Sequence, residues 1–336
     1  MLKFVRSTRA TLRPAASKPA TVQPAICGGT PGQRARILAA CALLAVTSMP
    51  VLASTPINES RPLDPRGRVD IENLKGRIQV RAWDRAEVKI EGNLGAGVEM
   101  LEITGDRERL AVRVKYPNRG GGLGFLVGGD KSEPTDLRLM VPLQAGLEID
   151  SVSADIDVSG VAPDELSIDS VSGDVTVAGA PLRASIDSVS GDLALTLNRS
   201  SVNAATVSGD IHLRGRLGTQ IAVETVSGNI DVAAIGAALR ELAGATVSGD
   251  MRIGAALAGN GDIKLESVSG DIDLTLPRNL SARVSAQSFS GDLQAPGADI
   301  QRTRHGPGSG LEHRYGSGSG EVSIETFSGD ARLQLD

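Results

Sequence analysis

Short stretches of alternating apolar and polar residues recur along most of this 336-residue chain. In one of them the apolar positions are Ile168, Val171, Val175 and Val177, with Gly173 between the two pairs. The same offsets return in two close copies and a more divergent one: Ile186, Val189, Gly191, Leu193 and Leu195; Leu265, Val268, Gly270, Ile272 and Leu274; and Ile71, Leu74, Gly76, Ile78 and Val80. A period of two predicts β-strands with one buried face. We therefore expect an all-β protein built from pairs of short strands.

The tetrapeptide Val-Ser-Gly-Asp, or a close variant, lies at the middle of each unit. It begins at residues 152, 171, 189, 207, 226, 247, 268, 289 and 327, so successive copies are 19, 18, 18, 19, 21, 21, 21 and 38 residues apart. The last spacing is about two periods. Units this short cannot bury their apolar side alone and are typical of stacked repeats. We predict a parallel β-solenoid (β-helix) of about nine coils of 18–21 residues, with strands pairing from coil to coil.

The alternation breaks once in each unit. Ile168 and Val171 are three residues apart, so a chain that buries both side chains must turn a corner or bulge between them. Gly173 tolerates unusual backbone angles at that corner. Each coil should then consist of a strand, a corner, a second strand and a return turn. An antiparallel sandwich is the alternative, but it does not need the same tetrapeptide at every turn.

The residues that flank the repeats predict other structures. Residues 54–66 are rich in proline and polar residues, and we expect a linker there. Residues 67–147 should form an N-terminal β-sheet cap with two hairpins, one at Glu99–Tyr116 and one with a glycine-rich tip at 120–129. Residues 148–336 should form the repeat region, with an irregular loop or hairpin at 295–320 and the final repeat, Val322–Leu335, closing the rod. The one helix expected is short, over Ile235–Leu242.

The first 53 residues have the features of a signal peptide with an extended basic leader. They hold seven Lys or Arg residues and no Asp or Glu, and an apolar run of ten residues follows Arg36. Small residues before position 54 suit a cleavage site, and the run is shorter than the roughly 20 residues that a membrane-spanning helix needs. Leu38–Cys41 also spells a lipoprotein cleavage site, but the apolar run continues beyond it. We expect cleavage near Ala53, export to the periplasm or cell surface, and no transmembrane helix in the mature chain.

Composition and charge exclude several kinds of function. The 28 basic and 40 acidic residues after the leader give a net charge of −12, which repels a nucleic-acid backbone. One Trp, two Tyr and four Phe are too few for sites that stack bases or sugars on rings. Both cysteines, Cys27 and Cys41, lie in the leader, so the mature chain has no thiol chemistry. No nucleophile motif with His and acid partners is present. The sequence predicts no enzyme and no cofactor.

Aspartate recurs at the corner of most coils and is the feature most open to a chemical role. Carboxylates stacked about 5 Å apart repel each other unless something compensates. Hydrogen bonds from amides of the same turn are the favoured interpretation. A row of weak Ca²⁺ sites is the alternative, because carboxylate oxygens suit calcium. The candidate ladder is Asp174, Asp192, Asp210, Asp250, Asp271 and Asp292. His305, Glu312 and His313 could also converge as metal ligands, although solvated loop residues are the simpler interpretation.

The repeats and both ends of the repeat region resemble a known bacterial family. The opening segment, Ile71–Val80, reads Ile-Glu-Asn-Leu-Lys-Gly-Arg-Ile-Gln-Val, and the closing segment, Arg304–Asp330, contains Tyr-Gly-Ser-Gly and Ile-Glu-Thr-Phe-Ser-Gly-Asp. Over roughly residues 67–336 the chain is similar to the domain-of-unknown-function family labelled "putative adhesin", which is made of β-strand repeats. The resemblance implies an exported or envelope-associated protein, often linked to envelope stress, and supplies no catalytic residues.

We therefore expect a non-catalytic exported cell-envelope protein. It would act as an adhesin-like interaction module or structural scaffold through a repetitive β-solenoid surface. The partner would be an envelope protein or polymer, or another copy of the chain, and not nucleic acid. The alternative is a Ca²⁺- or polysaccharide-binding module that uses the aspartate ladder, with a carbohydrate-active enzyme less favoured.

Overall fold

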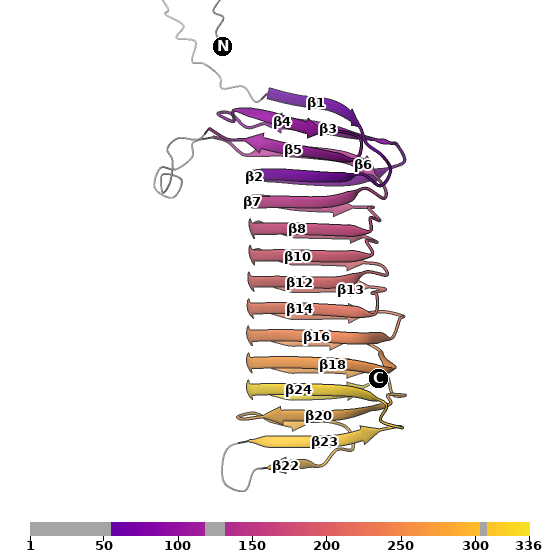
Figure 1. Cartoon of the computed structure of the whole chain (residues 1–336). Coiled ribbons are helices and arrows are strands. Elements are labelled where there is room, and N and C mark those ends of the chain that lie inside the picture. Colours follow the sequence, from indigo (N-terminus) through magenta and orange to yellow (C-terminus); the bar gives the residue numbers. More distant parts are fainter. Residues whose placement is uncertain (1–54, 118–131, 303–307) are drawn as a thin grey trace, which may run out of the picture. The chain divides into compact units, whose positions relative to one another are not determined.

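The computed structural model describes residues 55–117, 132–302 and 308–336, all within one compact unit. These residues form 25 β-strands and no helix (Figure 1), which confirms the all-β prediction. None of them forms a helix long and apolar enough to cross a membrane. The expected signal peptide and the glycine-rich hairpin tip lie outside the described residues.

The strands alternate along the chain between two faces of a stack. The first face contains β8 (Glu165–Ser172), β10 (Arg183–Ser190), β12 (Ser201–Ser208), β14 (Gln220–Ser227), β16 (Leu239–Ser248) and β18 (Leu257–Ser269). The second face contains β9 (Val175–Gly179), β11 (Leu193–Leu197), β13 (Ile211–Gly215), β15 (Ile230–Ala234), β17 (Met251–Gly254) and β19 (Ile272–Leu276). Neighbours within a face are parallel and in register, so that Ile168 lies beside Ile186 and Ile186 beside Ala204. The parallel β-solenoid is confirmed, and one strand from each face makes a level.

Two long strands each form a complete level. The first half of β2 (Arg68–Trp83) pairs with the first half of β7 (Gly146–Ser159) on the first face, where Ile71 meets Ile149. Their second halves pair on the second face, where Ile78 meets Ile156. The described residues therefore contain ten levels, one for each tetrapeptide and one for the divergent copy in β2.

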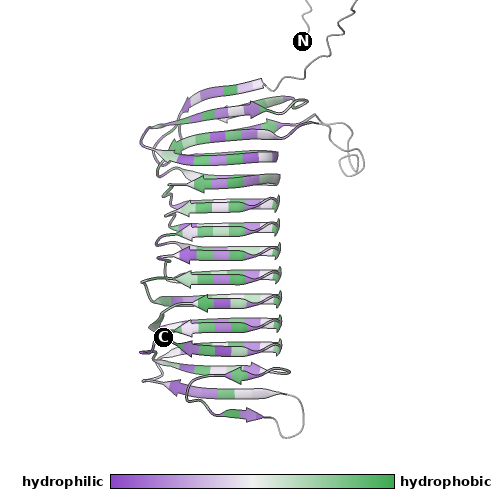
Figure 2. Ribbon diagram, turned by 180° about the vertical axis from the view of Figure 1, so that it is seen from behind, coloured by the Kyte–Doolittle hydropathy of each residue, from purple (hydrophilic) through white to green (hydrophobic). Residues whose placement is uncertain are grey.

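The interior is one apolar core between the two faces. On β8 and β9 the side chains of Leu166, Ile168, Val175 and Val177 are fully buried, and all belong to a single cluster that runs through the stack. Figure 2 shows the alternation as green and purple bands along the strands. Because levels are about 4.8 Å apart, each apolar side chain packs on its counterpart in the next level. This stacking supplies the burial that no single repeat could provide.

The corner differs from the prediction, which placed the tetrapeptide valine inside. Ser170 is buried and Val171 is 47% exposed. The alternation that buries Ile168 continues without a bulge, so the inward place at the corner goes to the residue before the valine. A small hydroxyl residue suits that place, because its oxygen can bond the turning backbone. Ser151 Oγ accepts from the Ala154 amide at 2.9 Å, and Ser267 Oγ donates to the Gly270 carbonyl at 3.2 Å.

Glycine at the corner is required by close stacking of the levels. Gly191 has a φ of +136°, and a Cβ built there would lie 2.2 Å from the carbonyl oxygen of Gly173. Only a residue without a side chain fits that gap. The same close contact of backbone with backbone recurs at the later corners, and the repeat keeps glycine at this position in every level from β8 onward, whereas the β7 corner has Ala154.

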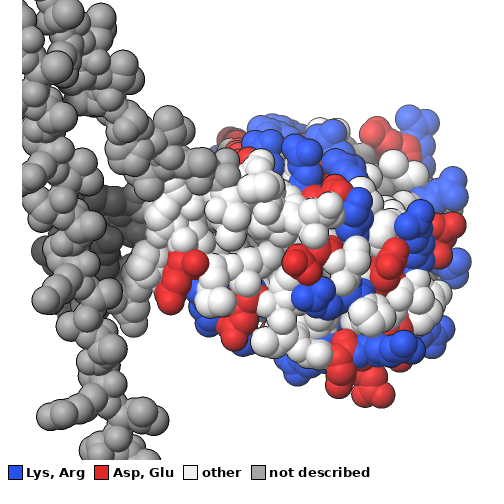
Figure 3. Space-filling view, turned by 90° about the horizontal axis from the view of Figure 1, so that it is seen from above, with Lys and Arg blue, Asp and Glu red and all other residues white. Residues whose placement is uncertain are grey.

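Additional strands cover the N-terminal end of the stack, as the cap prediction expected. Strands β6 (Thr135–Pro142), β3 (Glu87–Leu94) and β1 (Thr55–Pro62) continue the second face beyond β2, and β5 (Arg109–Lys115) and β4 (Met100–Gly105) continue the first. The hairpin expected at Glu99–Tyr116 is confirmed as β4 and β5. Most of the segment expected to be a linker is instead strand β1, because its backbone pairs antiparallel with β3. Figure 3, which looks onto this end, shows basic and acidic side chains interspersed.

The order of the levels changes at the C-terminal end. The last repeat, β24 (Gly320–Ser328) and β25 (Ala331–Leu335), lies between the level of β18 and β19 and the level of β20 (Ala282–Ser288) and β21 (Leu293–Gln294). An antiparallel hairpin of β22 (Ile300–Arg302) and β23 (Ser309–Tyr315) covers β20. The prediction that the final repeat closes the rod is wrong, since the chain end lies beside β24 in Figure 1 and the hairpin expected at 295–320 forms the end.

The short helix expected over Ile235–Leu242 is also absent. Leu239 and Leu242 are both fully buried, but they belong to the strand β16. The pairing of β16 with β18 shifts register between Leu239 and Glu241. This irregularity brings two apolar residues three positions apart onto one side, which imitates the helical spacing in the sequence.

Candidate interaction surface

The corner aspartates form a continuous hydrogen-bonded ladder. The Asp192 amide donates to Asp174 Oδ1 at 3.1 Å, and the Asp210 amide donates to Asp192 Oδ1 at 2.9 Å. The ladder includes Asn229, whose Oδ1 accepts the Asp250 amide at 3.0 Å. In spatial order its members are Asp155, Asp174, Asp192, Asp210, Asn229, Asp250, Asp271, Asp330 and Asp292. We call this set the aspartate ladder.

The ladder departs from the predicted turn in one respect. Each carboxylate of the ladder before the last, Asp292, accepts the amide of the next level, and not an amide of its own turn. Each rung therefore links two levels, and the amide compensates part of the repulsion between stacked carboxylates. An asparagine oxygen accepts the same bond, which explains how Asn229 occupies one rung.

The metal-site alternatives gain no geometric support. The described residues contain no group of three or more His, Cys, Asp or Glu side chains placed to hold a metal ion. His313 packs edge-on against Tyr315, with ring centroids 4.6 Å apart, and Glu312 lies 3.9 Å from Arg283. His305 lies outside the described residues. Calcium binding by the ladder stays a prediction.

An exposed apolar stripe runs along the corner beside the ladder. Its side chains from β8 onward are 47–56% exposed. The flanking residues pair in register at every level, which aligns the stripe along the stack. Near the C-terminal end the rings of Phe289 and Phe327 stack in parallel, 4.7 Å apart. We call this set the corner stripe; in spatial order it is Leu74, Val152, Val171, Val189, Val207, Val226, Val247, Val268, Phe327 and Phe289.

A column of acidic residues follows the other side of the corner stripe, two positions earlier on each first-face strand. Register places Asp150 beside Asp169 and Asp169 beside Asp187. The column is interrupted only by Ala205, Ala245 and Gln287. We call this set the first-face acidic column; its members are Glu72, Asp150, Asp169, Asp187, Glu224, Glu266 and Glu325.

Two grooves lie between the corner stripe and the first-face acidic column. One, of about 280 Å³, is lined at the levels of β2, β7, β8 and β10. The other, of about 920 Å³, continues from β12 through β18 and β24 to β20 and the start of β23. The same three positions of a level line both grooves: the position of the acidic column, the buried position that follows it, which is Ser or Thr at every level except that of Asn73, and the position of the stripe. Together the two grooves follow all ten levels.

The carboxyls in the smaller groove are crowded. Burial raises the pKa of Asp150 above its usual value, and the neighbouring charges of Asp169 and Glu148 raise it further. Burial likewise raises the pKa of Asp169, with Asp187 as the next largest cause. No ion pair joins any of these three aspartates to a described Lys or Arg. The groove thus concentrates negative charge beside an apolar surface.

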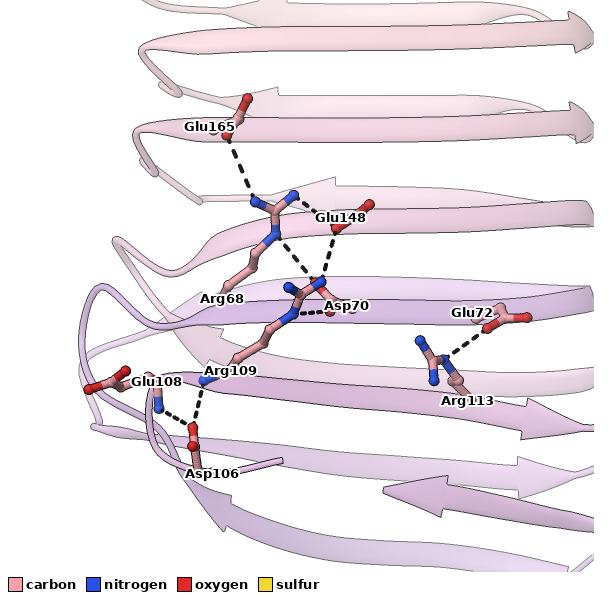
Figure 4. A network of polar contacts seen from close by, with 9 residues as sticks. All are labelled: Arg68, Asp70, Glu72, Asp106, Glu108, Arg109, Arg113, Glu148 and Glu165. Atoms are coloured by element: carbon pink, nitrogen blue, oxygen red, sulfur yellow. Dashed lines mark hydrogen bonds and ion pairs between the residues drawn. The ribbon is translucent and has the colours of Figure 1, made fainter. Parts of the chain in front are cut away.

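At the N-terminal end of the first face, arginines neutralise several acids (Figure 4). Asp70, which is 8% exposed, lies between Arg68 and Arg109. The network reaches β7 and β8 through Glu148 and Glu165, and among the described residues the only ion pair of the acidic column beyond β2 is the one between Glu266 and Lys264. The strongest pairs are Arg109 Nε with Asp70 at 2.7 Å, Arg68 Nη2 with Glu148 at 2.8 Å and Arg113 Nε with Glu72 at 3.0 Å.

A turn residue completes the network in Figure 4. Asp106, between β4 and β5, accepts the amides of Glu108 at 2.9 Å and Arg109 at 3.0 Å. These hydrogen bonds lower the pKa of the Asp106 carboxyl. The turn fixes the start of β5, from which Arg109 reaches Asp70.

Comparison with known proteins identifies the repeat region. A family model described as Toastrack DUF4097 matches residues 136–259 and 245–334, which together cover more than half of the chain. No curated protein matches the chain. The match covers most of the ten levels and the grooves between their columns.

Solved structures align with most of the chain at low sequence identity. A "putative adhesin" from Bacteroides fragilis is 10% identical, covers 84% of this chain and 98% of its own, and has a TM-score of 0.38. A "putative adhesin" from Parabacteroides merdae is 13% identical, with coverage of 83% and 96% and a TM-score of 0.37. A "putative lipid binding protein" from Parabacteroides distasonis is 11% identical, with coverage of 83% and 96% and a TM-score of 0.45. These values are too low to transfer a function.

Proposed function

Because the chain belongs to the Toastrack DUF4097 family, we propose that it is a non-catalytic exported protein of the cell envelope that serves as an interaction or structural scaffold. One observation carries the proposal: the corner stripe continues over ten levels, with acidic residues beside it at most of them. A surface of this kind binds by many weak contacts in a row. The partner would then be elongated, or would occupy several levels at once.

The distribution of titratable groups supports a non-catalytic role. Catalysis needs an acid, a base or a nucleophile brought together at one point. The carboxylates of the corner instead lie in columns, with one residue of each column at each level. In the ladder, one carboxylate oxygen accepts a hydrogen bond from the amide of the next level. The described residues include no convergent group of metal-ligating side chains. Shape and charge along the stack are therefore the features that a partner would recognise.

The export part of the proposal is supported by the first 53 residues. Their positive charge, apolar run of ten residues and small residues before position 54 are typical of a secretory signal. The acidic remainder of the chain has no Cys and hence no need for an oxidising compartment. Its stability in the envelope would come from stacking alone.

Localisation tests this proposal directly. A C-terminal tag would follow the chain through fractionation of cells into cytoplasm, periplasm and membranes. We expect the tagged protein in the envelope fractions, shortened by about 53 residues relative to the translated sequence. Protease added to intact cells then separates the two scaffold roles: digestion supports surface adhesion, and protection until the outer barrier is broken supports a periplasmic scaffold. An unprocessed protein in the cytoplasm would overturn the proposal.

A further inference from the structure

We propose that the groove beside the corner stripe binds an extended, positively charged polypeptide segment that also carries apolar side chains. The segment would run along the stack and cross the strands. This inference rests on the proposed function, since it names the partner class for the same surface. The grounds are the apolar side chains of the corner stripe, the acidic residues on both sides of that stripe, and the other kinds of partner that these acids disfavour.

The apolar contribution comes from the corner stripe. Val189, Val207 and Val226 occupy successive levels and are each nearly half exposed. Scattered exposed apolar residues are common on soluble proteins, but a contiguous row of them marks a contact site. Phe289 and Phe327 extend the row with stacked rings at the C-terminal end. A partner gains most by placing apolar side chains along this row.

The charge comes from acids on both sides of the stripe. The first-face acidic column borders it on one side and the aspartate ladder on the other. A few cations touch these borders, including Arg113 at Glu72 and Lys264 at Glu266. No Lys or Arg in the described part of the chain forms an ion pair with seven of the acids in these rows: Asp150, Asp169, Asp187, Glu224, Asp174, Asp192 and Asp210. The raised pKa values of Asp150 and Asp169 agree with this lack of cations.

The same charges argue against other occupants. A second copy docked stripe to stripe would bring four rows of carboxylates together, which is unfavourable at an interface. Acyl chains of an anionic lipid would carry their head groups towards the acidic borders. A cationic segment instead places positive charges beside the acidic column and the aspartate ladder, and its apolar side chains cover the corner stripe.

The length of the surface sets the length of the ligand. Ten levels separated by about 4.8 Å span roughly 43 Å. An extended polypeptide advances about 3.3 Å per residue, so about 13 residues would follow the whole stripe. Binding should therefore strengthen with peptide length up to about that number.

Fluorescence anisotropy with three labelled 14-residue peptides tests the proposal on the full chain. The first peptide has lysine at alternate positions, with leucine and serine taking turns between them. The second has serine in place of every leucine, and the third has glutamate in place of every lysine. We expect the first to bind at least tenfold more tightly than the other two, and its affinity to fall as salt rises, because exposed charges are screened.

Matched variants locate the binding. The triple variant Asp169→Asn, Asp187→Asn and Glu224→Gln removes three charges beside the stripe, and we expect it to weaken the first peptide about tenfold. The control removes three charges at the opposite edge of the first face, by Glu241→Gln, Asp262→Asn and Glu321→Gln, and should change affinity less than twofold. Val189→Ser, Val207→Ser and Val226→Ser should also weaken binding about tenfold, and these exposed positions leave the core intact.

Three results would overturn the inference. They are equal losses in the acidic triple variant and its control, equal binding of the glutamate peptide, and no binding of the first peptide at concentrations up to 1 mM, on the order of the weakest specific affinities. Retained unfolding midpoints show that a variant has lost binding and not its fold. If localisation places the protein in the envelope while these binding tests fail, the scaffold proposal stands and the cationic partner does not.

Discussion

Replacement of Gly191 by alanine should destabilise the stack strongly, although it adds one methyl group at the surface. Gly191 lies at the corner between β10 and β11, where its backbone touches the level of Gly173. The added Cβ would lie 2.2 Å from the Gly173 carbonyl oxygen, and the φ of +136° is one that alanine rarely adopts. Both problems arise at the same point, so a local side-chain rotation cannot relieve them.

The size of the effect follows from two terms. A non-glycine residue at such a φ costs about 1–3 kcal/mol. The contact can be relieved only if the two levels move apart by roughly 1 Å, since C···O contacts normally exceed about 3 Å. That movement stretches two hydrogen bonds between the levels: the one from the Val175 amide to the Asp192 carbonyl, now 3.0 Å, and the one from the Asp192 amide to Asp174 Oδ1, now 3.1 Å. At about 1 kcal/mol for each bond, we expect a total loss of about 3–5 kcal/mol.

Urea unfolding followed by circular dichroism measures this loss. A destabilisation of this size should lower the unfolding midpoint by about 1 M or more. The matched control is Gly254→Ala at the end of β17, where φ is not positive and the nearest atom to a new Cβ is the Val232 carbonyl oxygen at 3.9 Å. The control should leave the midpoint unchanged or raise it slightly, because alanine reduces the freedom of the unfolded chain.

Equal midpoints for the two glycine variants would refute this account of the corner. It would mean that the levels separate or shift without loss, and that glycine recurs at the corner for a reason other than backbone contact. A lower midpoint for Gly254→Ala than for Gly191→Ala would contradict it in the same way.

Three further predictions address the ladder, the groove and the end of the stack. Asp192→Asn should change the free energy of unfolding by less than about 0.5 kcal/mol, and Asp192→Ala should lower it by about 1 kcal/mol, since only alanine loses the oxygen that accepts the Asp210 amide. Millimolar Ca²⁺ should raise the melting temperature of neither variant if the ladder is structural. The pKa of Asp169 is raised in the folded chain, so ionisation of this carboxyl destabilises the fold above that pKa, and the destabilisation is lost as the pH falls through that pKa. Asp169→Asn should therefore raise the urea midpoint of unfolding at pH 7 and not at pH 3. A chain ending at Ser319 should lose hydrogen-exchange protection in β20 and β23 but keep it in β8 to β15, because β24 joins β20 to the rest of the stack.

Much of this fold was predictable because the repeat expresses stacking directly. Apolar residues such as Ile168 and Val175 recur at fixed offsets, and only a chain that places each copy on the next can bury them all. The period therefore gave the parallel pairing, and the number of tetrapeptides gave the number of levels apart from the one in β2. The hairpin at Glu99–Tyr116 followed from local alternation in the same way.

The corner stripe was missed because valine is apolar and Val171 was therefore placed in the core, whereas an apolar residue can also be exposed. Its exposed position follows from the alternation carried strictly through Ile168, Asp169 and Ser170, which makes the serine the inward residue at the corner. The invariable Ser or Thr before each stripe residue from Val152 onward was the available signal. Grouping residues by polarity alone assigned the valine to the core and left the most distinctive surface of the molecule unrecognised.

The position of the last repeat could not be predicted, because the copies are interchangeable partners. Ile263 of β18 pairs with Val322 of β24, but Val284 of β20 has the same shape and polarity. What differs is the segment after β20, which folds back as an antiparallel strand and occupies the far edge of that strand. The order of the levels is therefore decided by the hairpin and not by the repeat.

That order also protects the stack from its own repetition. A bare terminal level would offer a parallel edge that fits any other copy of the repeat, which favours end-to-end association. At the N-terminal end the outermost pairings are antiparallel, β1 on β3 and β4 on β5, and at the C-terminal end the first face closes with β23 on β20 and β22 on β23. The second face ends there in β21, which pairs parallel with β25 but is only two residues long, and so short an edge strand offers little for another copy to pair with. An antiparallel strand presents the wrong direction for another repeat to continue the parallel stack. Insertion of the last repeat behind the hairpin thus leaves the corner stripe, and not the ends, as the surface open to a partner.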